Sequence, residues 1–358
     1  MSTIGERLKA ARHRAGLSQR SLAQKVGLSA MAISKYERGE MVPNSSMLIR
    51  LAQALDTQVA YLLRPPSLSL SAPAFRKHHA LSARARQALL AQAQDWLERY
   101  LDVEALFPEE QALFAMPEGW PQSASTMEAV EEAATALRQV WGLGLDPIDN
   151  LAETLEDLGI KVGILPAVDH FDALTLWANE RVPAMVVRES IPGDRERFNL
   201  AHELGHLMLR PIDDLDEEKA ANRFAGAFLV PARAAYRELG RNRRHLSTEE
   251  LHLLKHKYGL SMQAWIYRAR DLGIISPSYA VQAFKAFRQN GWHRQEPGRP
   301  YPYEYPQRMR RLVLRALADG LISRSRAAEL LATPWDAFAQ KNEVLLHDVT
   351  IAAARFGA

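Results

Sequence analysis

The 358-residue sequence contains no cysteine. This absence excludes disulfide-linked scaffolds, cysteine-ligated zinc and iron–sulfur sites, and catalysis by a thiol nucleophile. No apolar run approaches the roughly 20 residues that a membrane helix requires, and the first residues lack the apolar core of a secretion signal. Hydrophobic residues make up 47% and charged residues 24% of the chain, as in ordinary folded proteins. We therefore expect a cytoplasmic protein of two or three domains that does not enter a membrane.

Positive charge is concentrated at the N-terminus. The whole chain has a net charge of only +3, but residues 1–64 contain ten Lys and Arg residues against four acidic ones, an excess of six positive charges. A short, strongly basic N-terminal segment in an otherwise nearly neutral chain is typical of nucleic-acid-binding proteins. A basic face that only improves solubility would give the same charge, so the helix pattern of this segment has to decide between the two.

This basic segment carries the pattern of four short helices. The first has an apolar face that stops at Gly16, and the second and third follow the N-cap candidates Ser18 and Ser29, with Gly27 between them. A fourth apolar face follows Pro43. Two short helices joined by a tight, Gly-containing turn inside a bundle of four or five helices indicate a helix-turn-helix.

The segment LSQRSLAQKVGLSAMAISKYERGEMVPNSSMLIRLAQAL resembles the Cro/cI-type helix-turn-helix of the XRE family of regulators, over about residues 4–63. The resemblance implies a homodimer that binds double-stranded DNA at a palindromic operator. It also implies that Arg12 pairs with Glu37 and that Gln19 contacts a backbone phosphate. The DNA-contacting set that we derive from it is Gln19, Ser29, Ala30, Met31, Ser34, Lys35 and Arg38.

Physical chemistry distinguishes the members of this set. Lys35 can donate hydrogen bonds to guanine O6 and N7. Ala30 and Met31 can make only apolar contacts, for example with thymine methyl groups, or they are ordinary helix surface. Direct base recognition by this helix is therefore expected to involve few side chains.

Residues 65–122 are predicted to hold a linker and one amphipathic helix. The stretch 64–79 is rich in Pro and Ser. The helix expected at about 82–101 could serve in dimerisation or docking, or pack onto the next domain.

The next predicted domain covers residues 123–276. Two helices, at 125–141 and from Pro147, precede three short extended runs, IKVGILP, ALTLWAN and AMVVRES, and a further helix begins at Arg195. We therefore predict an α+β class, mainly α with a small three-stranded β-sheet.

The sequence His202-Glu203-Leu204-Gly205-His206 is an HExxH motif. Residues four apart share one face of a helix, so both imidazoles can bind a single metal ion. Zinc suits two neutral imidazoles and a carboxylate, with the fourth position left for water. Glu203 could take a proton from that water and pass it to a leaving amine. The alternative is a chance pair of helix histidines beside a glutamate.

A third metal ligand is expected in the downstream segment DDLDEEKAANRFAGAFLVP. Glu218 precedes a helical pattern of apolar residues and could direct its carboxylate toward the metal. Glu217, Asp216 and Asp214 are competitors that spacing alone does not exclude.

Three blocks in order, RERFNLAHELGHLMLR, EKAANRFAGAFLVP and YGLSMQAWIYRARDLGIIS, resemble the ImmA/IrrE metallopeptidase domain across about residues 125–276. The resemblance implies a gluzincin-like fold, one zinc ion per chain, and Glu218 as the third zinc ligand. It also implies site-specific cleavage of a repressor protein that releases stress or mobile-element genes. Because the repressor-like and protease-like domains share one chain here, the substrate stays open. If the chain cleaves itself, we expect the first cleavage site within the Pro/Ser-rich residues 67–75.

Residues 277–358 are predicted to form a C-terminal helical module, with a turn at Gly320 and a helix capped at Ser323 or Ser325. The whole sequence thus predicts a DNA-binding transcription regulator, located on the nucleoid when bound to DNA. Its zinc endopeptidase domain would cleave itself or a partner repressor to relieve repression under stress. The alternative is a regulator whose metallopeptidase-like domain senses a ligand or metal without proteolysis. The presence of Glu203 favours the protease, because a binding-only site has no need of a base.

Overall fold

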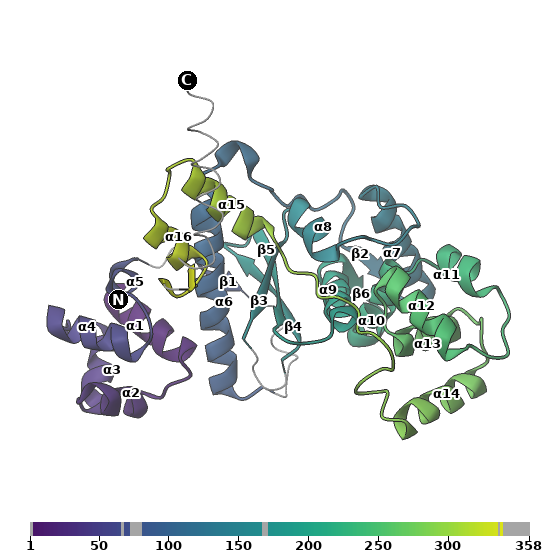
Figure 1. Ribbon diagram of the computed structural model, residues 1–358, viewed down its shortest axis with the longest axis horizontal. Helices are drawn as coiled ribbons and strands as arrows, with labels where there is room; N and C mark the ends of the chain where they lie inside the picture. The colour runs from purple at the N-terminus through teal and green to yellow at the C-terminus, as the bar shows by residue number, and fades with distance from the viewer. Residues whose placement is uncertain (1–2, 66–67, 72–80, 167–170, 336, 339–358) are drawn as a thin grey trace. The chain divides into compact units, whose positions relative to one another are not determined.

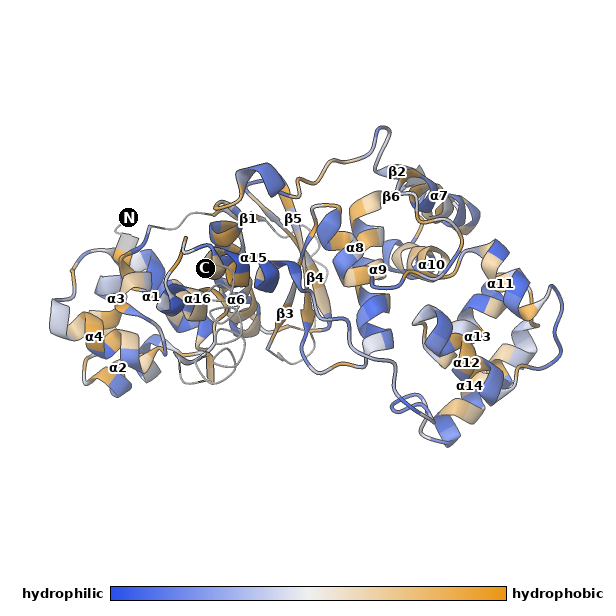
Figure 2. Ribbon diagram, turned by 45° about the horizontal axis from the view of Figure 1, so that its top comes forward, coloured by the Kyte–Doolittle hydropathy of each residue, from blue (hydrophilic) through white to orange (hydrophobic). Residues whose placement is uncertain are grey.

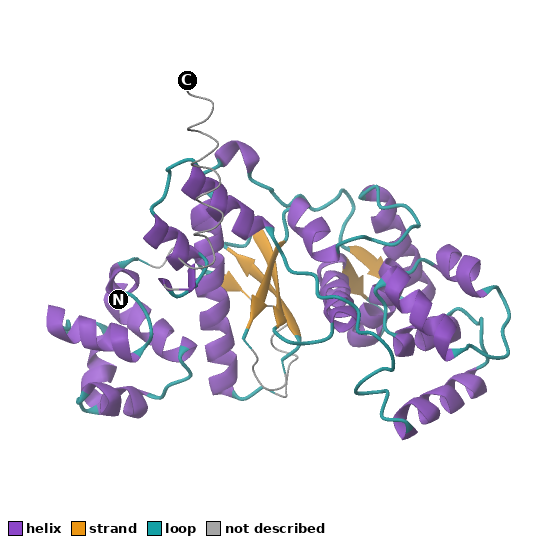
Figure 3. Cartoon of the chain, in the orientation of Figure 1, coloured by secondary structure: helices purple, strands orange, loops and turns teal. Residues whose placement is uncertain are grey.

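The structure is a computed structural model that describes residues 3–65, 68–71, 81–166, 171–335 and 337–338 (Figure 1). Helices dominate, and strands lie in two places, a four-stranded sheet and a separate pair (Figure 3). The predicted class, mainly α with a small β-sheet, is confirmed. Apolar and polar residues are mixed along the helices, as expected for helices with one buried face (Figure 2). Within the described residues, no helix combines the length and apolar character needed to cross a membrane.

The N-terminal bundle is the predicted helix-turn-helix. The hydroxyls of Ser18 and Ser29 accept hydrogen bonds from the backbone N–H groups of the third helical residues that follow, which makes both serines N-caps as expected. Gly27 ends the second helix in the left-handed region, with φ of 63°, which a glycine adopts without strain. The five helices are α1 (Thr3–Arg14), α2 (Gln19–Val26), α3 (Ala30–Arg38), α4 (Ser45–Ala54) and α5 (Val59–Leu63). Their shared core includes Leu8, Leu22, Ile33, Leu51 and Leu62.

Part of the predicted linker forms a strand, β1 (Leu70–Ser71), at the edge of the main sheet. It pairs antiparallel with β4, and the neighbouring Ser69 bonds to Asn179 through both its N–H (3.0 Å, to Oδ1) and its carbonyl oxygen (2.9 Å, from the backbone N–H). The prediction of a linker missed this strand, because two residues carry no periodicity and the open edge of a distant strand supplies the partner. Most of the segment 67–75 expected to hold a self-cut lies outside the described residues.

The main sheet has the strand order β1-β4-β5-β3. Its three longer strands are the three predicted ones: β3 (Lys161–Leu165), β4 (Ala173–Ala178) and β5 (Val182–Arg188). β4 runs antiparallel to β5, with Thr175 opposite Met185, and β3 runs parallel to β5. The second sheet, a parallel pair of β2 (Gln122–Ala124) and β6 (Leu209–Pro211), was not predicted.

Eight helices complete this part of the chain around one apolar core. That core joins Leu204 of α9, Phe224 and Phe228 of α10 and Trp265 of α13 to Met185 of the sheet. The helix predicted to open at Pro147 begins four residues later, because the Asn150 side chain caps it by accepting from the N–H of Glu153. The helices are α7 (Met127–Val140), α8 (Leu151–Asp157), α9 (Gly193–Met208), α10 (Glu217–Leu229), α11 (Ala232–Leu239), α12 (Thr248–Tyr258), α13 (Met262–Asp271) and α14 (Pro277–Gln289).

The compact units of the chain differ from the domain boundaries expected from the sequence. Residues 277–306, expected in a C-terminal module, belong to the unit built from residues 1–93 and 113–306. Their last part binds to α9: Arg197 donates a hydrogen bond to the Glu304 carboxylate, and the N–H of Glu304 donates to Glu196 Oε2 (3.1 Å). These charged contacts between distant segments leave no pattern in the local sequence.

The second unit comprises residues 94–112 and 307–358, of which the structure describes residues 94–112, 307–335 and 337–338. It contains the C-terminal end of α6 (Ala83–Glu104), a short 3-10 helix (Pro108–Glu110), α15 (Arg308–Ala318) and α16 (Arg324–Leu330). Val103 and Phe107 share a core with Leu312, Val313 and Leu330. Ser323 caps α16 by accepting from the N–H of Arg326, so of the two predicted caps it is Ser323 that acts.

Candidate metal centre and helix-turn-helix

The HExxH motif lies in the C-terminal half of α9. Leu200, Leu204 and Leu207 bury one face of this helix, which turns the two histidines toward the opposite side. The Nε2 atoms of His202 and His206 lie 3.0 Å apart, and the ring centroids 4.7 Å apart. Both rings are largely shielded, with 17% and 8% of their side-chain surface exposed. One turn of helix thus aims two imidazole nitrogens at a common point.

Helix α10 approaches α9 closely at Gly205. A β-carbon built on Gly205 would lie 3.1 Å from Ala221 Cα and 3.3 Å from the Ala221 carbonyl oxygen, closer than a β-carbon normally packs. The glycine between the two histidines therefore allows α10 to pass at this short distance. As a result, the first turn of α10 reaches the histidine face of α9.

Glu218, in that first turn, meets both histidines. Its Oε2 lies 3.4 Å from His202 Nε2 and its Oε1 lies 3.4 Å from His206 Nε2. The three residues form a group that could hold a metal ion, with ligand atoms all within 4.8 Å of one another. Four ligands at about 2.0–2.1 Å from a tetrahedral zinc ion are separated by about 3.3 Å, close to the three spacings observed. The donor set and its dimensions therefore fit one zinc ion.

The other acidic residues of this segment have different contacts. Asp216 is the N-cap of α10, and its carboxylate accepts from the N–H of Lys219 (2.9 Å). Asp214 lies in the preceding turn with a positive φ of 59°. Glu217 Oε1 lies 3.2 Å from His206 Nδ1, the ring nitrogen on the far side from the proposed metal. Of the four carboxylates that the sequence left open, the structure brings Glu218 to both Nε2 atoms.

Glu203 is buried next to this cluster, with 3% of its surface exposed. Its carboxylate accepts a hydrogen bond from the Thr175 hydroxyl of β4 (2.8 Å). Burial raises the pKa of Glu203 to about 7, against the lowering effect of the hydrogen bonds with Thr175, and the nearby charge of Glu218 acts in the same direction as burial. A carboxylate with a pKa near neutrality is suited to accept and release a proton.

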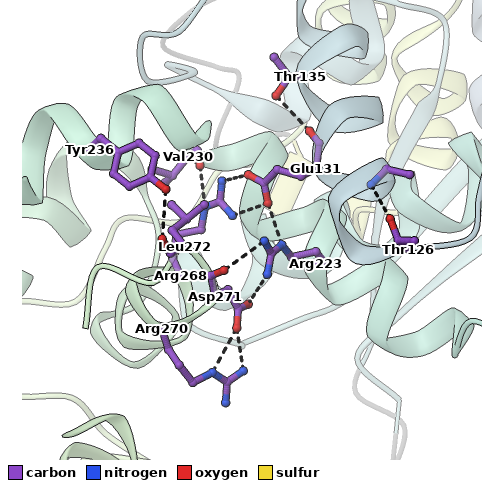
Figure 4. Close-up of polar contacts among 11 residues, drawn as sticks. Thr126, Glu131, Thr135, Arg223, Val230, Tyr236, Arg268, Arg270, Asp271 and Leu272 are labelled. Atoms are coloured by element: carbon purple, nitrogen blue, oxygen red, sulfur yellow. Dashed lines mark hydrogen bonds and ion pairs between the residues drawn. The ribbon is translucent and has the colours of Figure 1, made fainter. Parts of the chain in front are cut away.

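A buried ion-pair network holds the middle of α10 (Figure 4). The Glu131 carboxylate on α7 accepts from Arg223 Nε of α10 (2.7 Å) and from both terminal nitrogens of Arg268 on α13. Arg268 also donates to the carbonyl oxygen of Val230 (2.8 Å), and Arg223 lies 3.5 Å from Asp271. Three helices are therefore joined by charges that are mostly removed from water.

The predicted DNA-contacting residues gather on and beside α3. Ala30, Lys35 and Arg38 are exposed, and Met31 is 68% exposed. Ser34 is half-buried and accepts from Arg38, which also pairs with Glu40 (2.5 Å). Exposed side chains on one face of α3 are the arrangement that reading a DNA groove requires.

Two further members of this set have structural contacts. The exposed Ser29 uses its hydroxyl as the N-cap of α3. Gln19 Nε2 donates to Glu37 Oε2 (2.8 Å), and Arg12 binds the same carboxylate through two bonds of 2.5 and 2.9 Å. The predicted Arg12–Glu37 pair is thus present, and Gln19 extends it.

Comparison with known proteins assigns two parts of the chain to families. Residues 8–62 match the family described as helix-turn-helix, and residues 155–270 match the IrrE N-terminal-like domain. The chain joins an XRE-type helix-turn-helix domain to an ImmA/IrrE-like domain. The proposed metal cluster lies within the stretch that matches the IrrE-like domain, and the exposed residues of α3 lie within the other.

Individual relatives share one small domain with this chain. Repressor protein C2 of Salmonella phage P22 is 38% identical over 76 residues, 21% of this chain and 35% of that protein. The HTH-type transcriptional regulator ImmR of Bacillus subtilis is 33% identical over 67 residues, 19% of this chain and 53% of that protein. A crystal structure of the P22 c2 repressor with a synthetic operator matches at 39% identity over 18% of this chain and 97% of that chain, with a TM-score of 0.17. The chain thus spans between a third and about half of the length of the two relatives.

Sequence reasoning missed two residues of the IrrE-like site, Thr175 and Asn222, and it named Glu217 only as a competing metal ligand. Thr175 lies on a strand 28 positions before Glu203 and gives no motif. Asn222 and Glu217 contact the outer nitrogens of the two histidines. The spacing of Asn222, four residues after Glu218 on one helix, was a usable signal that both side chains face the same neighbour.

Proposed function

We propose that this protein is a DNA-binding transcription regulator whose IrrE-like domain is a zinc-dependent endopeptidase. Its substrate is this chain or a partner repressor, and the cut relieves repression under stress. The observation that carries the proposal is the convergence of two imidazole nitrogens and the Glu218 carboxylate beside the buried carboxylate of Glu203. A metal site that only sensed a ligand would not need this fourth residue.

The donor set supports one zinc ion held by His202, His206 and Glu218. Two neutral imidazoles and one carboxylate leave one tetrahedral position open, which is the arrangement of catalytic rather than structural zinc sites. The chemistry that zinc supplies in such a site is Lewis-acid activation of a water molecule and of a carbonyl oxygen.

The remaining chemistry belongs to side chains of this chain. With the metal bound, Glu203 would accept the proton of the attacking water and would deliver it to the nitrogen of the leaving amine. The Thr175 hydroxyl holds one oxygen of that carboxylate (2.8 Å), which limits the rotation of the side chain. The burial of Glu203 excludes bulk water from the carboxylate and keeps its pKa near 7, so one group can act in both directions.

The proposal for DNA rests on the basic N-terminal bundle and the exposed face of α3. Lys35 can donate to a guanine edge in the major groove, and Met31 can contact a thymine methyl group. We propose binding as a homodimer to a palindromic operator, because two symmetric bundles read two half-sites. The similarity to one protein named as a repressor and to another named as a transcriptional regulator supports this proposal. The protein would act in the cytoplasm, on the nucleoid when bound to DNA.

The decisive experiment uses Glu203→Gln, which keeps the side-chain size and the three proposed ligands. Purified wild-type protein, loaded with zinc, is incubated alone and with a candidate repressor, and fragments are identified by mass spectrometry. We expect the variant to bind zinc and DNA like the wild type, and we expect its cleavage rate to fall by about 100-fold or more. Glu249→Gln, an exposed position on α12, is the control.

Two results would contradict the proposal. Absence of stoichiometric zinc in the wild type would remove the metal site. A wild-type response to the inducing stress in cells that carry Glu203→Gln, with no fragment of either protein, would leave the domain as a sensor without proteolysis.

A further inference from the structure

We infer that α10 orients both metal-binding imidazoles, with Asn222 positioning His202 and Glu217 positioning His206. The inference rests on the proposed metal site and adds to it two residues that touch the ligands and not the metal. It also gives the adjacent glutamates different roles. Glu218 faces the inner nitrogens, which are the Nε2 atoms of both histidines, and Glu217 faces an outer one, the Nδ1 atom of His206.

The contact of His202 fixes its tautomer. His202 Nδ1 lies 3.0 Å from Asn222 Oδ1, and an amide oxygen can only accept a hydrogen bond. Nδ1 must therefore carry the proton, which leaves the lone pair of Nε2 directed toward Glu218. A neutral imidazole with its proton on Nε2 would instead present a hydrogen atom to the metal position.

The contact of His206 has the same consequence through a charged acceptor. Glu217 Oε1 lies 3.2 Å from His206 Nδ1, so this carboxylate also favours the Nδ1–H tautomer. Glu217 and Glu218 are one position apart on a helix and point in directions about 100° apart. One carboxylate therefore reaches the outer side of the His206 ring, and the other reaches the inner side.

The resulting geometry is unfavourable without a cation. With both protons on Nδ1, the two Nε2 atoms, 3.0 Å apart, and the Glu218 oxygens, 3.4 Å from them, are all hydrogen-bond acceptors. Acceptors that face one another repel, and a divalent ion between them removes the repulsion. Asn222 and Glu217 therefore hold the rings in the state that a metal ion requires before it arrives.

The position of Asn222 is itself fixed by packing on both sides. Ala221 lies against Gly205 of α9, and Arg223 is held by Glu131 in the buried ion-pair network (Figure 4). The residue between them has little freedom to move relative to α9. Asn222 nonetheless lies at the surface, so its replacement should not threaten the fold.

The first test is made on the metal-free protein. Nitrogen-15 NMR of histidine-labelled protein reports which ring nitrogen carries the proton. We expect His202 and His206 to be Nδ1–H tautomers in the wild type and in Asn222→Asp, which keeps an acceptor oxygen. In Asn222→Leu, which removes the acceptor, His202 should shift toward the Nε2–H tautomer, and in Glu217→Ala the same should happen to His206. Lys219→Ala, an exposed position between the two on α10, is the matched control.

The second test measures zinc affinity by competition with a chelator. We expect Asn222→Leu and Glu217→Ala each to weaken zinc binding roughly 10–100-fold. Asn222→Asp and Glu217→Gln, which keep an acceptor oxygen, should restore most of the affinity, and Glu218→Ala should lose more than any of them. Thermal unfolding of each metal-free variant shows whether the fold is intact.

The two tests separate this inference from the proposed function. Unchanged tautomers and unchanged zinc affinity in both Asn222→Leu and Glu217→Ala overturn the positioning roles, even if the wild type binds zinc. The inference is also overturned if Glu217→Ala loses as much zinc affinity as Glu218→Ala while the His206 tautomer stays unchanged. That result would make Glu217 a metal ligand. Tautomers that shift as expected in a protein that binds no zinc support the positioning contacts and refute the proposed metal site.

Discussion

Gly205 and Ala221 meet so closely that a β-carbon on the glycine would lie 3.1 Å from the Ala221 Cα. This contact sets the distance between α9, which carries both histidines, and α10, which carries Glu218. The site therefore depends on helix packing as much as on its ligands, because a shift of α10 by a few tenths of an ångström moves a carboxylate away from two imidazoles.

Gly205→Ala is expected to weaken zinc binding and to destabilise the domain by about 1–3 kcal/mol, the usual cost of overpacking a well-filled contact. Chelator competition and denaturant unfolding measure the two effects. The matched control is Gly226→Ala on α10, where the new β-carbon would find its nearest neighbour, Arg268 Cδ, at 3.6 Å, an ordinary contact. This control should be neutral or slightly stabilising, since alanine favours helices. Equal zinc affinity in both variants would show that the site tolerates a wider helix spacing.

Glu131→Ala is expected to destabilise the protein by about 3–5 kcal/mol, because it leaves the buried guanidinium of Arg268 and that of Arg223 without their shared carboxylate. Glu128→Ala, at an exposed position one turn earlier on α7, should change stability little. Denaturant unfolding of both variants is the measurement. A loss below about 1 kcal/mol in Glu131→Ala would mean that water or other acceptors replace the carboxylate.

Glu131 should also make the free energy of unfolding depend on pH. Burial alone would raise the pKa of Glu131, but the ion pairs with Arg268 and Arg223 outweigh it and lower the pKa. A carboxylate with a lowered pKa contributes stability above its unfolded pKa of about 4.5, and this contribution is lost as the pH falls through the folded value. Wild-type stability should therefore decrease below pH 4.5 more steeply than that of Glu131→Gln.

Glu196 is expected to make the free energy of unfolding fall as the pH rises, which is the opposite of the effect of Glu131. Burial raises the pKa of Glu196 to about 8, against the lowering effect of the hydrogen bond from the Glu304 N–H. The charge of the Glu304 carboxylate acts in the same direction as burial, and Arg197 acts against it. Tyr303 also lies close. The folded state then holds a proton that the unfolded state releases near pH 4.5, so the stability supplied by this group falls as the pH rises from about 4.5 to about 8. The slope is at most about 1.4 kcal/mol per pH unit.

Glu196→Gln mimics the protonated form and should flatten this part of the stability profile. Unfolding by denaturant at pH 5, 7 and 9 compares it with wild type and with Glu249→Gln, the exposed control. An identical decline between pH 5 and 9 in Glu196→Gln and the wild type would assign the pH dependence to another group.

DNA binding is expected to weaken steeply between about 50 and 200 mM salt, because phosphate contacts release counterions. Lys35→Ala should cost about 1–3 kcal/mol on the preferred operator if the side chain reads a base. Lys9→Ala, exposed on α1, removes the same charge outside α3 and is the control. Equal losses on operator and random DNA in Lys35→Ala would make that residue a phosphate contact.

Gln19→Ala should weaken binding more evenly across DNA sequences. Because Gln19 donates to Glu37, its removal also loosens a contact that joins α2 to α3. Titration of operator and random DNA by fluorescence anisotropy compares the two losses. Selective loss on the operator would indicate that Gln19 takes part in base recognition.

Much of the fold could be predicted from the sequence because its signals are local. Ser18, Ser29 and Gly27 mark helix ends through contacts with residues at most five positions away, and the structure has those ends. The spacing of His202 and His206 fixes their common face for the same reason, since a helix repeats every 3.6 residues. The three longer strands and the mainly helical class follow from patterns of similar range.

The tertiary structure decided what depends on distant neighbours. Spacing could not choose between Glu217 and Glu218, because the choice depends on how closely α10 approaches α9 and on which ring nitrogen each carboxylate meets. Thr175 reaches Glu203 only because β4 passes beside α9. β1 pairs with a distant strand through its backbone, and Glu304 joins α9 through buried polar contacts. Neither kind of contact leaves a periodic pattern in the sequence. The sequence determined which chemical groups are present on each helix face, and only the packing of those faces against one another determined which groups meet.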